Sequence, residues 1–177
     1  SINTITMPRK FFQRFLPSPQ SIKDNRTLKI FGEWLHEPNL WHLNRRSVAG
    51  AFAVGLFCAW MPVPFQMVLA AGAAIWIRTN LPLSIVLVWI TNPVTIPPMF
   101  YFAYLVGTWI IGEPPVDFSF ELTFDWLQNE LSSSWQPFLV GCFTMASISS
   151  LIGYFAIDGF WRHSVLSRRA NKSHLKK

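Results

Sequence analysis

Charge is scarce in this 177-residue chain, and it is almost missing from one long stretch. Charged residues make up 14% of the sequence, whereas soluble domains contain about 25%. Between Ser47 and Ile111 the only charged residue is Arg78. A block of this length with a single charge does not suit a water-exposed surface. The composition therefore favours a protein that lies largely in a membrane.

The sequence also lacks the motifs of common catalytic and metal-binding sites. It has no glycine-rich phosphate loop, no nucleophile elbow and no His-Glu-x-x-His pattern. His36 and His42 have Pro38 between them and fit no common zinc spacing. Cys58 and Cys142 each lie inside an apolar run, where cysteine is usually a small buried hydrophobic residue. We therefore expect no enzymatic activity, no cofactor and no metal site.

The basic residues that are present gather near the two ends. Residues 1–46 carry eight of them and residues 162–177 carry six, while residues 112–136 are acidic and contain no Lys or Arg. Lys and Arg favour the cytoplasmic side of a membrane. This distribution predicts two cytoplasmic basic regions and an acidic outer loop at 112–136. A net charge of +6 could indicate nucleic-acid binding, but basic residues beside apolar segments do not favour it.

The N-terminal region, residues 1–46, has amphipathic patterning. Met7–Leu16 contains three phenylalanines on one side of a helix and basic residues that can reach lipid headgroups. Ser21–His36 predicts a second amphipathic helix, because its apolar residues recur at helical spacing. Both patterns predict a basic region that contacts membrane lipids.

Two proline clusters interrupt the apolar block, at residues 61–66 and 92–98. The prolines of these two breaks are Pro62, Pro64, Pro93, Pro97 and Pro98. The run before the first break, Ser47–Trp60, has 14 residues, whereas a spanning helix needs about 20. Proline removes a backbone donor, and unpaired backbone at membrane depth is tolerated only inside protein or beside water. The breaks are therefore expected to be buried in a helical bundle or to line a cavity.

Charge parity limits the topology. Pro137–Ile157 has 21 residues without charge and is expected to cross the membrane once. With both ends inside, the block from Ser47 to Ile111 must then cross an odd number of times. It could form two short tilted spans and then a span broken at 92–98, or a re-entrant hairpin over Ser47–Ile77 followed by the same broken span. We favour the hairpin.

The fold class predicted from these patterns is an all-α integral membrane helical bundle with Pro-broken or re-entrant helices. Its membrane domain is expected at residues 47–161, between the basic regions 1–46 and 162–177.

The polar residues at the breaks are candidates for a binding site. Polar groups in membrane segments need partners, so they either bind a ligand or cap backbone that the prolines leave free. Paired proline-interrupted segments are typical of transporter sites. A helix beginning near Pro97 would offer unpaired N–H groups to an anion, and Arg78 would add positive charge if it lay at the same depth. The candidate ligand-binding residues are Gln66, Arg78, Asn92 and Thr95.

Three motifs resemble a known family. They are Ser47-Val48-Ala49-Gly50, Pro62-x-Pro64-Phe65-Gln66 and Asn92-Pro93-x-Thr95-x-x-Pro98. Together they resemble a family of small bacterial inner-membrane proteins called domain of unknown function 2062, over roughly residues 31–154. The resemblance implies a location in the bacterial inner membrane and implies no reaction.

We therefore expect a multi-pass inner-membrane protein with both termini in the cytoplasm, which transports or handles a lipid-linked or small anionic solute between its two breaks. The alternative is a non-catalytic adaptor or scaffold that docks an envelope protein through its N-terminal region or its acidic loop. A second copy of the chain is a further candidate partner, because self-association would help to bury the polar groups of the breaks.

Overall fold

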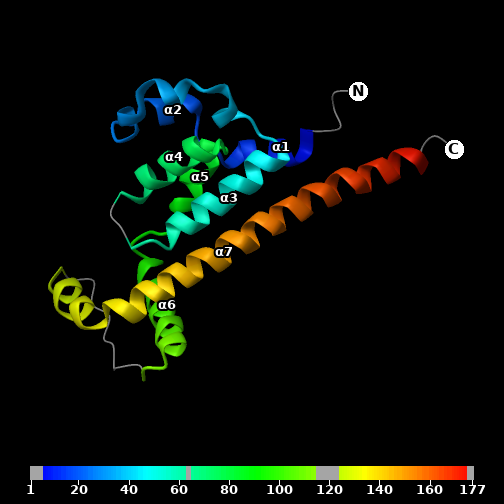
Figure 1. The fold of residues 1–177 in the computed structure, drawn as a ribbon. Coiled ribbons are helices and arrows are strands. Elements are labelled where there is room, and N and C mark those ends of the chain that lie inside the picture. Colours follow the sequence, from blue (N-terminus) through cyan, green and yellow to red (C-terminus); the bar gives the residue numbers. More distant parts are fainter. Residues whose placement is uncertain (1–5, 63–64, 115–123, 175–177) are drawn as a thin grey trace.

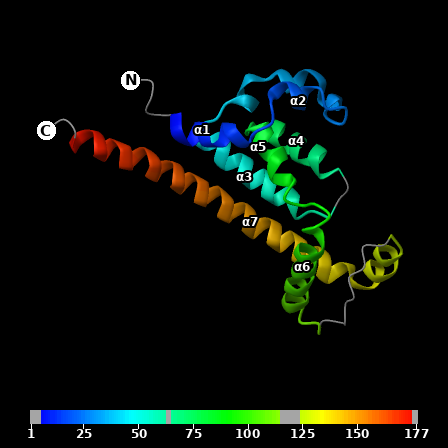
Figure 2. The same ribbon diagram turned by 180° about the vertical axis from the view of Figure 1, so that it is seen from behind.

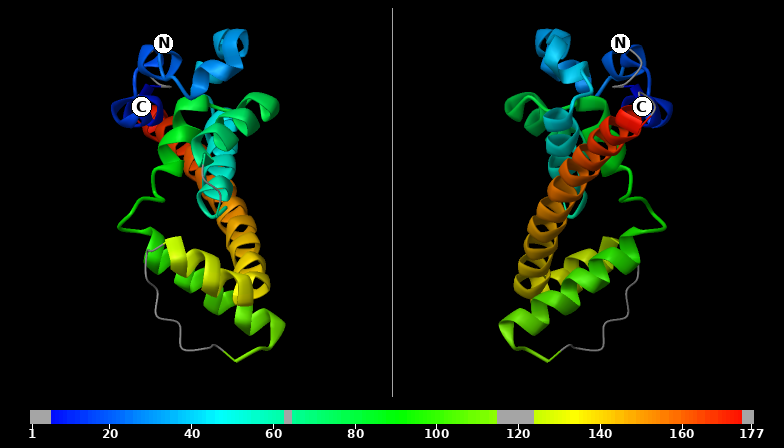
Figure 3. Two further views of the ribbon diagram at one scale, coloured as in Figure 1. Left: turned by 90° about the vertical axis from the view of Figure 1, so that its left-hand side faces the viewer. Right: turned by 90° about the vertical axis from the view of Figure 1, so that its right-hand side faces the viewer.

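The helices of this protein are arranged along one long helix (Figures 1 and 2). The computed structural model describes residues 6–62, 65–114 and 124–174, and all regular structure in those residues is helical. The predicted all-α class is therefore confirmed. The long helix is α7, Phe124–His174. The first helix, α1 (Thr6–Phe15), and the C-terminal end of α7 lie at one end of the molecule, with α6 (Ile96–Ile111) at the other (Figure 3).

The N-terminal region consists of short helices and not of one long one. Its elements are α1 (Thr6–Phe15), α2 (Pro19–Lys23), η2 (Leu28–His36) and η3 (Pro38–Trp41). The predicted helix over Ser21–His36 is wrong, because the chain leaves the helix between Lys23 and Leu28 and because Gly32, with a positive φ of 48°, interrupts the second segment. Leu28, Leu35 and Leu40 are buried in one cluster with side chains of the central helices. Apolar patterning thus predicted which residues pack inward but not the path of the backbone between them.

The central part of the chain doubles back on itself. Helix α3, Arg45–Ala59, is followed by α4, Gln66–Ile77, and the two pack through small residues such as Ala70 and Ala74. At the far end of α4 the backbone N–H of Asn80 donates to the carbonyl of Ser47, 3.3 Å away. The end of α4 therefore lies beside the start of α3, and the two helices form a closed hairpin.

After the hairpin the chain runs back along α3 and then beyond it. Helix α5, Leu81–Val88, starts beside Ser47, and the Thr91 hydroxyl just after it donates to the Ala59 carbonyl at 2.6 Å. Helix α6, Ile96–Ile111, then continues to the other end of the molecule. The break at 92–98 thus joins α5, which packs on α3, to α6, which packs on α7, whereas the break at 61–66 reverses the chain.

Helices α3 and α6 both pack along helix α7. Near one end Arg45 pairs with Asp158 at 3.2 Å, and near the middle the rings of Phe57 and Phe143 meet edge to face with centroids 6.0 Å apart. Beyond this point α6 takes the place of α3 along α7. Helix α7 begins at Phe124, so the second part of the 112–136 segment predicted as a loop is helical.

Helices α6 and α7 cross at backbone contact. A Cβ atom on Gly107 would lie 1.6 Å from the carbonyl oxygen of Pro137, and one on Gly141 would lie 1.6 Å from that of Ala103. Small residues at such a crossing let two apolar helices approach closely. The obstacle at each glycine is backbone, so no side-chain rotation can relieve it. This crossing positions α6 relative to the rest of the molecule.

Gly107→Ala is expected to destabilise the protein by about 1–3 kcal/mol, because the added methyl group overpacks against backbone. Gly159→Ala is the matched control. A Cβ there has no atom within 4 Å, and Ala in a helix is more stable than Gly by about 0.5–1 kcal/mol. Thermal unfolding of the purified variants measures both. A Gly107→Ala melting temperature equal to that of Gly159→Ala would contradict the close crossing.

Candidate functional site

Gln66 in the first break and Thr91, just before the second, bond to the same carbonyl group. The Gln66 side-chain amide donates to the carbonyls of Met61, at 2.5 Å, and Ala59, at 3.4 Å. Thr91 donates to the same Ala59 carbonyl. The last carbonyls of a helix have no partner within it, so these side chains satisfy the end of α3. The two breaks are therefore linked by side chains that satisfy backbone carbonyls at the end of α3.

The second break is capped by its own side chains. The Asn92 side-chain oxygen accepts the backbone N–H groups of Val94 and Thr95 at 3.0 and 3.1 Å. The Thr95 hydroxyl accepts the N–H of Asn92 at 2.9 Å and donates to the carbonyl of Ile90. These bonds satisfy the backbone groups where the chain leaves one helix and enters the next. Phe65 is nevertheless 76% and Val94 83% exposed, so both breaks reach the surface of the described chain and the prediction that they are buried within the bundle is wrong.

The start of α6 offers no free backbone donor to an anion. The N–H of Ile96 is bonded to the Asn92 carbonyl and that of Met99 to the Thr95 carbonyl. Pro97 and Pro98, between them, have no N–H. The prediction of unpaired N–H groups near Pro97 is therefore wrong, because the prolines themselves fill the positions where such groups would be.

Arg78 lies far from the breaks. It follows the 12-residue helix α4, so about 18 Å of helix separates it from Gln66. Its guanidinium is 3.7 Å from the carboxylate of Glu37 and is largely exposed. The four residues predicted as ligand-binding thus fall in two places, with Gln66, Asn92 and Thr95 at the breaks and Arg78 at the opposite end of α4. Their role in ligand binding stays a prediction.

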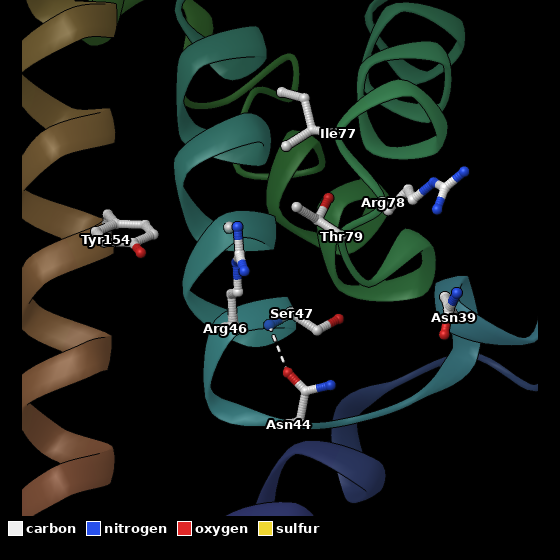
Figure 4. A pocket seen from close by; sticks show the side chains of 9 residues that line it. Asn39, Asn44, Arg46, Ser47, Ile77, Arg78, Thr79 and Tyr154 are labelled. Carbon is white, nitrogen blue, oxygen red and sulfur yellow. Dashed lines mark hydrogen bonds between the residues drawn. The ribbon is translucent and has the colours of Figure 1, made fainter.

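The place where Arg78 lies contains a pocket of about 490 Å³. It is lined by residues of the 39–50 segment, by the turn at 77–79 that follows α4, and by Tyr154 of α7. Figure 4 shows the Arg46 side chain rising along α3 between Tyr154 and Thr79. The closed hairpin creates this pocket, because it brings the turn after α4 beside the first turn of α3.

Two hydroxyl groups in this pocket are buried without a partner. Ser47 is 5% exposed and Thr79 is 4% exposed, and within the described chain neither hydroxyl has a hydrogen-bond partner. The N–H of Ser47 is satisfied by the Asn44 side chain at 2.8 Å, so only its hydroxyl is free (Figure 4). A buried polar group without a partner is costly, and each such group needs an explanation.

The charge around the pocket is positive. Its lining includes Arg46 and Arg78 and no carboxylate. Among the residues that the structure describes, Arg46 makes no ion pair, whereas the neighbouring Arg45 is bound to Asp158. The start of α3 adds the positive end of a helix dipole. The described residues contain no group of three His, Cys, Asp or Glu side chains that could hold a metal ion.

Asn80 holds the turn at 77–79 in place. Its side chain is fully buried, donates to the carbonyl of His42 at 3.3 Å and accepts the N–H of Leu83 at 3.0 Å. Arg46, Ser47, Thr79 and Asn80 were not predicted from the sequence as site residues. A signal was present at Asn80, since Asn followed by Leu-Pro is typical of a helix N-cap with proline in the first turn. No local pattern marked the two hydroxyls.

Thr95→Val is expected to destabilise the second break by about 1–3 kcal/mol, because it removes the hydrogen bonds of the hydroxyl and keeps the side-chain volume. Thr95→Ser keeps the hydroxyl and is expected to stay within about 0.5 kcal/mol of the wild type. Thermal unfolding compares the two variants. Equal losses would show that capping is not the role of this side chain.

The family comparison agrees with the motifs at the hairpin and the breaks. The family model described as "Uncharacterized protein conserved in bacteria (DUF2062)" matches residues 28–170. No curated protein and no solved structure is significantly similar to the chain. The match covers the pocket, both breaks and most of α7, and it leaves out only the two ends. The chain belongs to the DUF2062 family of bacterial proteins.

Proposed function

We propose that this chain is a multi-pass protein of the bacterial inner membrane that binds and handles an anionic solute, free or lipid-linked, without catalysing a reaction. The observation that carries the proposal is the pocket between α3 and the turn after α4. It is cationic, it contains two unpartnered hydroxyls, and it lies where the start of α3 meets the turn after α4.

The apolar surface of α7 supports a membrane location. Trp135–Ser167 within α7 is long and apolar enough to cross a membrane. Much of its apolar surface is exposed, including Phe143 at 62%, Ile152 at 62% and Phe155 at 66%. A helix of the core of a soluble protein would bury such side chains, whereas a helix in lipid exposes them.

The lengths of the other helices support the re-entrant topology. Helix α3 has 15 residues and α4 has 12, so each is about 18–22 Å long, short of the roughly 30 Å hydrocarbon core. Trp60, at the tip of the hairpin, packs against a buried cluster between α6 and α7 that includes Phe100 and Cys142. Helices α5 and α6 together provide 24 residues, about 36 Å, which suffices for one broken span.

The position of the arginines supports a cytoplasmic pocket. Arg45, Arg46 and Arg78 lie where the start of α3 meets the end of α4. Arg162 pairs at 2.9 Å with Asp158, the partner of Arg45. Lys and Arg favour the cytoplasmic side. In this arrangement both termini are cytoplasmic, and the pocket faces the interior of the cell near the depth of the lipid headgroups.

A second candidate function is a membrane adaptor. It is favoured by exposed apolar side chains in the N-terminal region, where Ile30 is 70% and Trp34 is 64% exposed. An envelope protein could dock on these side chains. The same residues could instead rest on lipid, which suits an amphipathic interfacial segment.

Anion binding is tested by thermal unfolding of the full chain in a maltoside detergent without phosphate. Carboxylates, sulfate and phosphate esters are added one class at a time. At about 100 times its dissociation constant, an anion that binds the pocket is expected to raise the melting temperature by on the order of 5 °C. Neutral sugars and polyamines serve as controls and are expected to have no effect.

The paired variant Ile30→Ser with Trp34→Ser separates the two functions. Anion handling predicts that it keeps the anion-induced shift, since neither residue lines the pocket. If no class of anion stabilises the wild type, while the paired variant loses the cellular role of the protein, the adaptor is the better account.

A further inference from the structure

Two unpartnered hydroxyls define what kind of anion the pocket suits. The Ser47 hydroxyl lies on α3 and the Thr79 hydroxyl on the turn after α4. In Figure 4 the Ser47 hydroxyl is directed away from α7, toward the side of the pocket where Asn39 and Arg78 lie. A hydroxyl is both a donor and an acceptor. Beside two arginines and no carboxylate, donation to an anion is the use that the surroundings favour.

The donors come from separate elements and do not lie in one row. Arg46 and Ser47 belong to the first turn of α3, Thr79 to the turn after α4, and Asn44 to the N-cap. The Asn44 side-chain oxygen is bound to the N–H of Ser47, which leaves its amide nitrogen as a further donor. A carboxylate presents two oxygens in one plane, whereas a phosphate group presents three or more in a tetrahedral arrangement and accepts bonds from several directions.

Arg46 is the cation that is free to engage such a group. No carboxylate among the described residues pairs with it, and its side chain lies within the pocket in Figure 4. Arg78 points away from Thr79 in the same view and is held only by a long, exposed contact of 3.7 Å with Glu37. Exposed ion pairs of this kind contribute little, so Arg78 can exchange Glu37 for a stronger partner.

We propose that this pocket binds a phosphate group, with the hydroxyls of Ser47 and Thr79 as buried donors and Arg46 as the principal counter-charge. The inference rests on the proposed anion handling and names the chemical class of its ligand. It also explains the two hydroxyls, because a bound phosphate supplies the partners that they otherwise lack. The phosphate can belong to a lipid headgroup or to a soluble ion.

The test measures binding of two probes to the full-length protein in a phosphate-free maltoside detergent. The probes are inorganic phosphate and dihexanoyl phosphatidic acid, and dihexanoyl glycerol, which lacks the phosphate, is the control. A lipid source predicts that phosphatidic acid binds more than about tenfold tighter than inorganic phosphate. A soluble source predicts affinities within about threefold of each other. Both results support the phosphate site.

The variants Ser47→Ala, Thr79→Val and Arg46→Gln are each expected to weaken phosphate binding at least about tenfold, because each removes a hydrogen bond to a charged group. Thr144→Val and Arg162→Gln are matched controls, since they remove a hydroxyl and a charge from α7 outside the pocket. These two are expected to bind as the wild type does.

The hydroxyl variants also carry a readout that a structural role would not give. Without ligand, Ser47→Ala and Thr79→Val are expected to raise the melting temperature by on the order of 2 °C, because each removes an unsatisfied buried group. A hydroxyl that merely stabilised the fold would lower it. Stability and phosphate affinity are thus expected to change in opposite directions.

Three results would overturn the phosphate site. These are no binding of either probe, equal binding of dihexanoyl glycerol, and wild-type affinity in all three pocket variants. If carboxylates stabilise the protein and phosphates do not, the proposed anion handling survives and only the phosphate site fails. If no anion stabilises it, both fail.

Discussion

The hydrogen bonds of one buried residue, Asn80, determine where the central hairpin closes. Its backbone N–H is bound to Ser47, its side-chain amide to His42, and its side-chain oxygen to the N–H of Leu83. The Ser84 hydroxyl in turn donates to the Asn80 carbonyl at 3.0 Å. In an apolar environment each of these groups would be costly without a partner. The turn after α4 is therefore fixed beside the start of α3, and the pocket, its arginines and the alignment of α5 with α3 all depend on this closure.

The breaks and the pocket differ in whether their polar side chains have hydrogen-bond partners. At the breaks every polar side chain that the sequence indicated is used to satisfy backbone, through the Ala59 carbonyl and the Asn92–Thr95 cap. Where the start of α3 meets the turn after α4, the hydroxyls of Ser47 and Thr79 and the guanidinium of Arg46 remain without partners in the described chain. Donors that are already bonded shape the fold, and donors that are free can bind a ligand. We therefore propose ligand binding at the end of the hairpin where Ser47 and Thr79 lie, and ligand binding at the breaks stays a prediction.

The sequence predicted the helical class, the positions of both breaks and the polar residues in them, because these follow from composition and from the geometry of proline. It could not predict that the breaks act differently. The chain reverses at the first one, where Phe65 adopts a left-handed conformation with φ 63°, and it continues at the second. Nothing in the local pattern of Phe65 requires that conformation. The pocket was missed because Ser47 and Thr79 are 32 positions apart and become neighbours only when the hairpin closes.

The depth of the hairpin tip is the most direct test of this account. Cys58→Ala and Cys142→Ala remove the native thiols, and single cysteines then replace Asn39, Met61 or Glu113 in membrane vesicles of known orientation. A membrane-impermeant maleimide is expected to label Asn39→Cys only from the cytoplasmic face and Glu113→Cys only from the outer face. Met61→Cys is expected to react from neither face and to react fully once detergent is added. Labelling of Met61→Cys from the outer face, as fast as Glu113→Cys, would mean that α3 and α4 cross the membrane completely and would contradict the re-entrant hairpin.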